Sequence, residues 1–231
     1  MGMKHHYYAS VLGILFLSAA CFAAETPDLK DQTNKESYSL GYQFGQSLKQ
    51  QGLSINLGAY TAGVQDSLSG TTPQLSQEEV NKTVSDVQSR VMAARQKEWR
   101  ALAEKNRSDG KAYLDANGKK EGVKTLPSGL QYKVLAEGKG KTPKATDEAT
   151  VHYRGAFIDG TEIDNSYKKG NPLTMKVNGV IRGWSEALQL MKEGSTWQLF
   201  IPPDLAYGER GTNRIPPNST LVFDIELISV K

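Results

Sequence analysis

The sequence predicts an α+β protein in which a helical N-terminal part precedes a C-terminal antiparallel sheet. In the first half of the chain, apolar residues recur every three to four positions, the spacing of an amphipathic helix. From Leu126 onwards they alternate with polar residues, which is typical of half-buried strands. We therefore expect a helical module of residues 25–75, a long connecting helix of residues 76–118 and a sheet domain of residues 119–231.

The composition is that of a folded protein and argues against several kinds of chemistry. Hydrophobic residues make up 38% and charged residues 23% of the chain, which is enough for a packed core. A formal net charge of only +3 gives no reason to expect a nucleic acid as partner. The chain has one cysteine, Cys21, and three histidines, His5, His6 and His152. This scarcity argues against a cysteine nucleophile, a disulfide framework and a zinc site, and we expect no cofactor or metal.

Residues 1–24 are expected to form a secretory signal peptide. Lys4 precedes an apolar run from Val11 to Ala24 that ends in small residues. The run is shorter than the roughly 20 residues that a membrane-spanning helix needs, but it fits the apolar core of a signal peptide. We expect cleavage near Ala24 and export to the periplasm. Cys21 lies in an imperfect lipoprotein cleavage box, so lipid attachment at the outer membrane or cell surface is the alternative interpretation.

The helical module is expected to contain two short amphipathic helices. Their apolar residues are spaced by four positions: Leu40, Phe44 and Leu48 in the first, and Tyr60, Val64 and Leu68 in the second. Two helices of a few turns cannot bury a stable core alone, so we expect a homodimer formed through them. Gly41 and Gly45 lie one turn apart, and they either admit a neighbouring helix closely or simply weaken their own helix.

The connecting helix is expected to span residues 77–117. Ser76 and Glu79 form a capping box at its start, and Asn117-Gly118 supplies the stop signal. Its C-terminal two-thirds has few apolar residues and many charges, which is typical of a solvent-exposed spacer. Gly110 marks a candidate bend or break.

The C-terminal domain is expected to be an antiparallel sheet with one short helix packed across it. The alternating patterns are centred on residues 130–134, 151–157, 173–177, 197–201 and 221–227. Asp159-Gly160 is a hairpin turn signal. The expected helix runs from Trp184 to Met191, where the apolar residues share one face.

Five ordered blocks of this domain carry a family resemblance. They read VHYRGAFIDGTEIDNS, GNPLTMKV, NGVIRGWSEALQLMKEGS, IPPDLAYGERG and IPPNSTLVFDIELISVK, and together they resemble the FKBP-type immunophilins. With the upstream helices, the chain resembles the branch of the macrophage infectivity potentiator (Mip) and FkpA-like isomerases. The resemblance implies helical modules that dimerise and a twisted sheet of five or six strands wrapped on a short helix. It also implies a peptidyl-prolyl cis-trans isomerase that acts on X-Pro bonds of exported proteins and has chaperone activity.

The resemblance further implies which residues form the site. Trp184 matches the indole on which the proline ring rests, while the Ile181 backbone N–H and the Tyr207 hydroxyl would bind flanking carbonyls. The other matching catalytic positions are Tyr153, Asp164 and Phe223. The expected substrate-binding residues are Ile163, Leu173, Met175, Val180 and Ile215. Proline-containing unfolded polypeptides are the implied substrates, and macrolides of the rapamycin type are the implied inhibitors.

Departures from the family pattern leave a second interpretation open. Ile163 stands where a phenylalanine is usual, and Leu173 and Met175 stand where aromatic residues are common. A pocket with fewer aromatic residues would suit a chaperone or binding module whose isomerase site is weak. Without the ordered blocks, Trp184 would be an ordinary core residue and Asp164 an ordinary turn residue, so the blocks carry the catalytic interpretation.

Overall fold

The computed structural model describes residues 26–231, so the expected signal peptide and Cys21 lie outside the described residues. The chain divides into an N-terminal unit that ends at Gln74 and a C-terminal unit that runs from Leu75 to Lys231. None of the helices between residues 26 and 231 combines the length and the hydropathy that a membrane span needs.

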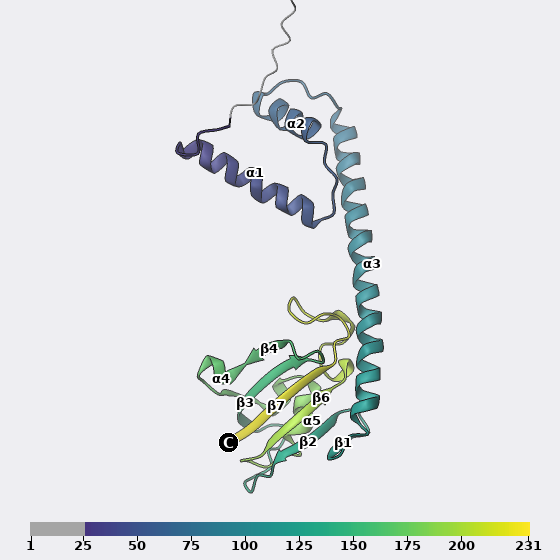
Figure 1. Cartoon of the computed structure of the whole chain (residues 1–231), viewed down its shortest axis with the longest axis vertical. Helices are drawn as coiled ribbons and strands as arrows, with labels where there is room; N and C mark the ends of the chain where they lie inside the picture. Colours follow the sequence, from purple (N-terminus) through teal and green to yellow (C-terminus); the bar gives the residue numbers. More distant parts are fainter. Residues whose placement is uncertain (1–25) are drawn as a thin grey trace, which may run out of the picture. The chain divides into compact units, whose positions relative to one another are not determined.

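The N-terminal unit contains two helices, α1 (Gln32–Gln50) and α2 (Leu57–Ser69), which Figure 1 labels. Asp31 and Asn56 cap them, because each side chain accepts a hydrogen bond from a backbone N–H of the first turn. Phe44 of α1 stacks on Tyr60 of α2 with ring centroids 5.6 Å apart. Neither helix has a buried residue, so the described part of one copy of this unit, residues 26–74, contains no buried core.

The C-terminal unit begins with α3 (Gln77–Asn117), an unbroken helix of 41 residues. The capping box of Ser76 and Glu79 is present as predicted. The expectation of a bend or break at Gly110 is wrong. Gly110 is buried, and a Cβ at this position would collide with the hydroxyl of Thr220. The glycine therefore allows the backbone of α3 to lie directly against Thr220.

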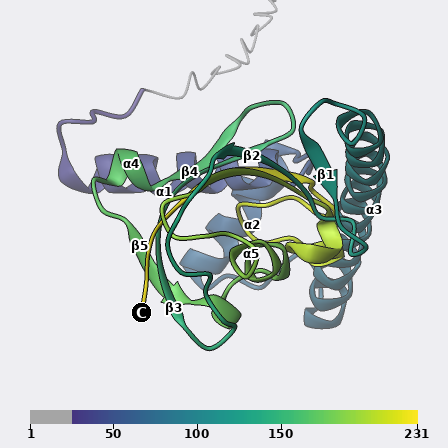
Figure 2. The same cartoon turned by 90° about the horizontal axis from the view of Figure 1, so that it is seen from below.

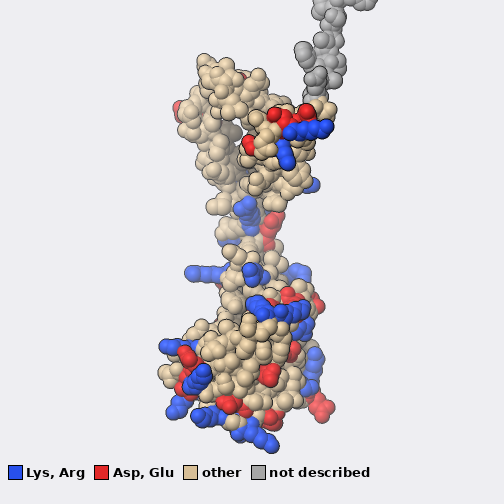
Figure 3. Space-filling model, turned by 90° about the vertical axis from the view of Figure 1, so that its left-hand side faces the viewer, with Lys and Arg blue, Asp and Glu red and all other residues tan. Residues whose placement is uncertain are grey.

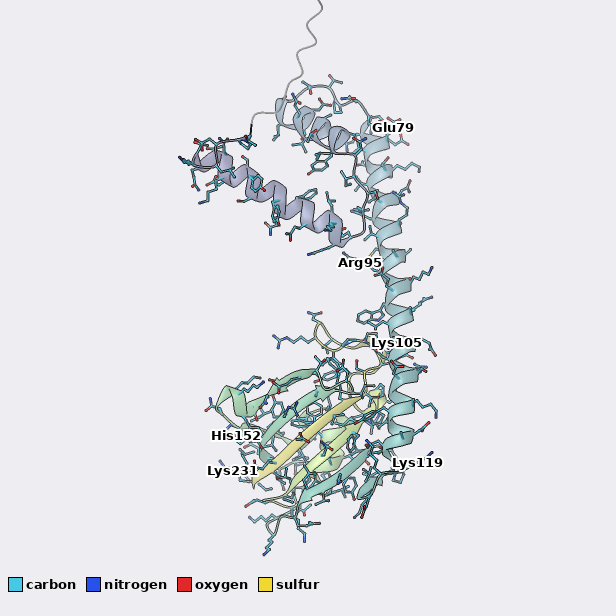
Figure 4. The ribbon with its side chains drawn as sticks, in the orientation of Figure 1. Glu79, Arg95, Lys105, Lys119, His152 and Lys231 are labelled. Carbon is cyan, nitrogen blue, oxygen red and sulfur yellow. The ribbon has the colours of Figure 1, made fainter. Side chains whose placement is uncertain are left out.

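The C-terminal part of α3 docks on the sheet, and Figure 4 labels Lys105 and Lys119 near the two ends of this stretch. The residues of its inward face recur once per helical turn, with a pair at 113 and 114: Ala103, Asn106, Gly110, Tyr113, Leu114 and Asn117. The Asn117 amide donates to Gln131 Oε1 at 3.0 Å, and the Gln131 amide donates to the Leu114 carbonyl at 2.9 Å. The expectation of a solvent-exposed spacer is therefore wrong for this stretch of the helix.

Seven strands form one antiparallel sheet in the order β1-β2-β6-β7-β3-β4, and β5 pairs with β3 beyond the end of β4. Their bounds are β1 Val123–Thr125, β2 Gln131–Ala136, β3 Glu148–Phe157, β4 Glu162–Asn165, β5 Leu173–Lys176, β6 Thr196–Ile201 and β7 Leu221–Val230. The alternation pattern located all of them except β1 and β4. β1 has only three residues and β4 has four, of which just Ile163 is apolar, so neither shows an alternation of apolar and polar residues.

The sheet curves around α5 (Arg182–Leu188), as Figure 2 shows. Three of the four buried residues of α5, Trp184, Ala187 and Leu188, belong to one hydrophobic core with fully buried strand residues such as Leu199 and Ile225. Burying one such aliphatic side chain is worth about 1.5–3 kcal/mol relative to exposing it. The predicted fold class, an α+β chain whose sheet wraps on one short helix, is confirmed.

Short helical segments lie in the connections between the strands. They are α4 (Ser166–Lys169) and the 3₁₀ turns η1 (Val177–Gly179), η2 (Pro203–Leu205) and η3 (Gly208–Arg210). On the face of the C-terminal unit that Figure 3 presents, acidic and basic side chains are interspersed. This distribution gives that face no large patch of one sign.

Candidate active site

A cavity of about 600 Å³ opens beside α5, between the sheet and the loops around η1 and η3. Its lining residues are Tyr153, Ile163, Asp164, Leu173, Gly179, Val180, Ile181, Trp184, Tyr207, Arg214, Ile215 and Phe223. A hollow of similar size, about 620 Å³, lies between α3 and the β3–β4 hairpin, but Phe157 is the one aromatic residue that lines it. An apolar cleft with a few polar groups is the usual form of a ligand site, so the cavity beside α5 is the better candidate.

Three aromatic rings form the inner end of this cavity. The Trp184 ring meets the Phe223 ring at 88° and the Tyr153 ring at 74°, with centroids 5.2 Å and 5.1 Å apart. Tyr153 and Phe223 lie 6.4 Å apart. Edge-to-face pairs of this kind are stabilising beyond the area that they bury. Trp184 is only 5% exposed, so it forms the closed base of a hollow whose upper part is open.

A glycine allows Phe223 to reach this position. Gly155 of β3 pairs with Phe223 of β7, and a Cβ on Gly155 would overlap the Phe223 ring. The absence of a side chain on β3 is therefore what lets the ring lie flat against the strand and complete the aromatic base.

Besides Trp184 Nε1–H in the base of the cavity, two hydrogen-bond donors on its walls have no partner among residues 26–231. The Ile181 backbone N–H precedes the first turn of α5 and donates to no group of the described chain. Tyr207 lies across the cavity, is 41% exposed, and its hydroxyl makes no hydrogen bond with a described residue. Both donors are thus available to a bound molecule.

Asp164 is held by three donors. The Tyr153 hydroxyl donates to Asp164 Oδ2 at 2.7 Å, the Asn165 backbone N–H donates to Oδ1 at 2.8 Å, and Lys169 Nζ lies 2.6 Å from Oδ1. The Lys169 ammonium and then the Tyr153 hydroxyl lower the pKa of Asp164 against the opposing effect of burial. Burial first, and the bond to Asp164 second, raise the pKa of Tyr153 to about 12. The carboxylate and the neutral phenol therefore persist together over a broad pH range.

The hydroxyl of Ser166 fixes the backbone of Tyr153. Ser166 Oγ accepts from the Tyr153 N–H at 2.7 Å and donates to the Tyr153 carbonyl at 3.1 Å. His152 Nδ1 lies 3.0 Å from the same oxygen, and the tautomer that carries its proton on Nδ1 completes this arrangement as the donor. His152 stacks on Tyr167 at 4.4 Å on the side of β3 away from the cavity, and Figure 4 labels it on the strand. His152 is therefore not a member of the site.

Helix α3 anchors the loop that carries Tyr207 and Ile215. The Asn106 amide donates to the Pro217 carbonyl at 2.8 Å, and the Asn218 amide donates to the Ala103 carbonyl at 3.3 Å. Arg107 also forms an ion pair with Glu209 of η3. The loop wall of the cavity is thus attached to the docked part of the helix.

Ten of the eleven residues expected at the site line this cavity, and Met175 does not. Met175 is half-buried on β5 and packs against the hydrophobic core. Sequence reasoning missed two lining residues, Gly179 and Arg214. Only their place in the sequence could have indicated them, because each directly precedes an expected site residue, Val180 or Ile215.

Comparison with known proteins adds two family matches. Residues 139–228 match the family described as "FKBP-type peptidyl-prolyl cis-trans isomerase", and residues 33–134 match "Domain amino terminal to FKBP-type peptidyl-prolyl isomerase". The chain is 45% identical to "Outer membrane protein MIP" of Legionella longbeachae over 96% of each protein. It is 41% identical to "FKBP-type peptidyl-prolyl cis-trans isomerase FkpA" of Escherichia coli (strain K12), over 94% of this chain and 84% of the relative.

The structure is also similar to a solved one. It matches the crystal structure of FkpA from Escherichia coli with a TM-score of 0.71 and 42% sequence identity. The match covers 87% of this chain and 98% of the other. The similarity therefore extends over both the N-terminal unit and the C-terminal unit that contains the sheet.

Proposed function

This chain belongs to the FKBP-type peptidyl-prolyl cis-trans isomerases, and we propose that it rotates X-Pro bonds in the aromatic cavity over Trp184. The family resemblance inferred from the five sequence blocks is confirmed, because the two family matches cover most of the chain. The observation that supports the site assignment is an aromatic base, in which Trp184 packs edge-to-face with Tyr153 and Phe223, beside two donors that have no partner among residues 26–231. X-Pro segments of polypeptides are the substrates.

Rotation about an X-Pro bond is slow because the amide is resonance-stabilised, with a barrier of about 18–20 kcal/mol. The twisted transition state has lost this resonance and is less charge-separated than the planar amide. Water therefore stabilises the ground state more than the transition state. Transfer of the bond into a cavity with dry aromatic walls lowers the barrier, and each 1.36 kcal/mol gained is about tenfold in rate.

Each residue of the cavity then has a defined task. Trp184 supports the proline ring, and Tyr153 and Phe223 exclude water from its two sides. The Ile181 N–H and the Tyr207 hydroxyl bind carbonyl oxygens that flank the rotating bond, so that one end of the segment is held while the other turns. Asp164 fixes the Tyr153 ring by accepting its hydroxyl proton in a hydrogen bond, and it borders the rotating amide. No step requires a nucleophile or a general acid.

The remaining wall of the cavity is aliphatic. It consists of Ile163, Leu173, Val180 and Ile215, which we assign to the side chains next to the proline. Aliphatic walls give apolar contact without ring stacking, so we expect macrolides of the rapamycin type to bind here less tightly than in a fully aromatic pocket.

The test is a protease-coupled isomerase assay on a short X-Pro peptide. Trp184→Ala is expected to lower kcat/KM by about ten- to hundredfold, and Tyr207→Phe by a few-fold, since each removes a contact made in the transition state. Trp99→Ala is the matched control, because Trp99 is an exposed tryptophan of α3 outside the cavity. Tyr207→Phe removes one partly exposed oxygen and does not threaten folding. Parental activity in both site variants would falsify the assignment.

The N-terminal unit supports a further proposal, that two copies of the chain dimerise through α1 and α2. Large apolar side chains are exposed on both helices, for example Leu40 at 69% and Leu68 at 84%. Isolated helices of this length are marginal in water unless their apolar faces are covered. Light scattering on the full chain is expected to show a dimer, and Leu40→Asp is expected to shift it toward the monomer. A monomeric parent contradicts this proposal.

We also propose that the protein is exported and assists folding in the periplasm. The apolar segment before Glu25 supports export, and the relative from Legionella longbeachae is named an outer membrane protein. Two catalytic cavities in one dimer would allow an unfolded client to be bound at two places. A refolding assay on a proline-limited protein tests this proposal, since the dimer should act faster than the same number of monomeric Leu40→Asp chains.

A further inference from the structure

We propose that Arg214 makes this isomerase selective for X-Pro segments that carry an acidic side chain next to the proline. The inference rests on the proposed function of the cavity, and it adds a specificity-determining residue to it. Arg214 lines the cavity, and its side chain is exposed.

The charge of Arg214 is not balanced by the chain itself. Among the ion pairs formed by residues 26–231, none includes Arg214. The other charged residue of the lining is Asp164, which is bound to Lys169 and Tyr153. Its negative charge is therefore already compensated, and the guanidinium is the remaining net charge at the cavity mouth.

Two acidic residues of the loop and of β4 are also engaged elsewhere. Glu209 of the same loop pairs with Arg107 of α3. Glu162 of β4 pairs with Lys168 and Arg154. Since no acidic residue among residues 26–231 pairs with Arg214, a carboxylate from a bound segment does not have to displace one of them.

The backbone around Arg214 is ordered by local hydrogen bonds. Thr212 Oγ1 accepts from the Arg214 N–H at 3.2 Å and from the Ile215 N–H at 3.0 Å, and the Thr212 N–H donates to the Ile215 carbonyl at 2.7 Å. Gly211 closes this turn with φ 56°, where a Cβ would collide with the Ile215 carbonyl. The guanidinium therefore starts from a fixed point beside Ile215, whose 5% exposed side chain forms the wall of the cavity.

A guanidinium at this place selects by charge and shape. It is permanently protonated and offers a planar fork of donors that matches a carboxylate. Because the pair forms at a partly exposed rim, its effect is modest and decreases with salt. We expect a glutamate beside the proline to raise kcat/KM about three- to fivefold over glutamine, and a lysine to lower it by a similar factor.

The experiment measures kcat/KM on peptides Ala-X-Pro-Phe, with X as Glu, Gln or Lys, at low and at high ionic strength. The parent is expected to prefer the Glu peptide over the Lys peptide about tenfold at low ionic strength and less at high. In Arg214→Gln this ratio should fall to near one, and in Arg214→Glu it should invert. Arg210→Gln is the matched control and should keep the parental ratio, because Arg210 is an exposed arginine of the same loop that does not line the cavity.

A parental ratio near one at low ionic strength overturns the proposal, and so does a parental ratio that survives in Arg214→Gln or is lost equally in Arg210→Gln. These outcomes differ from a failure of the proposed function. In that case the Gln peptide itself would turn over no faster with the parent than with Trp184→Ala, and both proposals would fall together.

Discussion

Helices α1 and α5 illustrate two ways of using an amphipathic pattern. Helix α1 has 19 residues and buries none of them, whereas α5 has seven residues and buries four. Both have apolar residues at helical spacing, but α5 is enclosed by the sheet and α1 is left with an open apolar face. The difference shows that periodicity identifies a face that must be covered, while the cover itself comes from the rest of the fold or from another chain.

The largest expected effect on stability comes from truncating a buried leucine of the C-terminal unit, and an exposed leucine of the N-terminal unit provides the comparison. Leu199 is fully buried in β6 and Leu40 is 69% exposed on α1. Leu199→Ala should lower the free energy of unfolding of the C-terminal unit by about 2–5 kcal/mol, because it removes apolar contacts and leaves a cavity. Leu40→Ala should leave that transition within about 0.5 kcal/mol of the parent and act on dimer dissociation instead.

Chemical denaturation followed by tryptophan fluorescence measures the first effect, since Trp184 and Trp197 both lie in the core of the C-terminal unit. Sedimentation at several concentrations measures the second. An equal loss of C-terminal stability in both variants would show that the N-terminal helices are covered by their own chain.

The next effect contrasts two helical glycines. Gly110→Ala should destabilise the C-terminal unit by about 1–3 kcal/mol, because its Cβ collides with Thr220 where α3 meets the sheet. Gly63→Ala on α2 has open space around the new Cβ, so it should stabilise its helix by about 0.5–1 kcal/mol.

Thermal unfolding monitored by circular dichroism measures both changes. The double variant Gly110→Ala/Thr220→Ala should recover part of the loss, since it removes the hydroxyl that the Cβ meets. A Gly110→Ala variant as stable as the parent contradicts the docking of α3.

A smaller effect compares two asparagines of α3. Asn106 anchors the Pro217 carbonyl behind the catalytic loop, whereas Asn81 bonds only to Gln77 on the exposed part of the helix. Loss of a hydrogen bond costs about 0.5–1.5 kcal/mol, so Asn106→Ala should raise KM by about two- to tenfold through a looser loop. Asn81→Ala should change neither KM nor kcat. A similar change in both variants would mean that α3 supports the fold without positioning the loop.

The smallest expected effect is that of pH on catalysis. The lowered pKa of Asp164 adds stability that is present above its unfolded value of about 3.9 and is lost as pH falls through the folded value. The raised pKa of Tyr153, about 12, adds stability that is present below its unfolded value of about 10 and is lost as pH rises through 12. The value of kcat/KM should therefore stay within twofold between pH 5 and 9. Exchange measurements by NMR avoid a coupling protease, and a titration with a midpoint near 7 would indicate acid–base catalysis.

Much of the fold was predictable because its signals are local. The capping box and the Asn117-Gly118 stop signal predict the ends of α3, and the structure places them at the same residues. The docking of α3 was not predictable in this way. Its inward face consists mainly of Ala103, Asn106, Gly110 and Asn117, which are small or polar residues that a search for apolar periodicity passes over. The contact between α3 and the sheet depends on close backbone approach and on hydrogen bonds. Neither can be recognised in the sequence unless the residues that α3 packs against are already known.

The residues that line the cavity could be predicted about as well as the elements of the fold. The residues of the ordered blocks meet at one cavity because five separate segments each carry part of it, an arrangement that local pattern alone cannot establish. Met175 was expected at the site because the family resemblance places it there with Leu173, whereas the lining of the cavity includes Leu173 and not Met175. Arg214 was missed because nothing in the sequence distinguishes an arginine that borders a cavity from one, such as Arg210, that does not.

Ser166, which opens α4 directly after β4, has a consequence for strand addition to the sheet. Strand β3 has β5 along its first residues and β4 along its last, and the hydroxyl of Ser166 occupies the interval at Tyr153. Both main-chain groups that an incoming strand would need at this point are therefore already engaged. An extended polypeptide cannot add itself to the sheet edge here. This point of the sheet is thus closed to strand addition, both by a bound polypeptide and by a second copy of the chain.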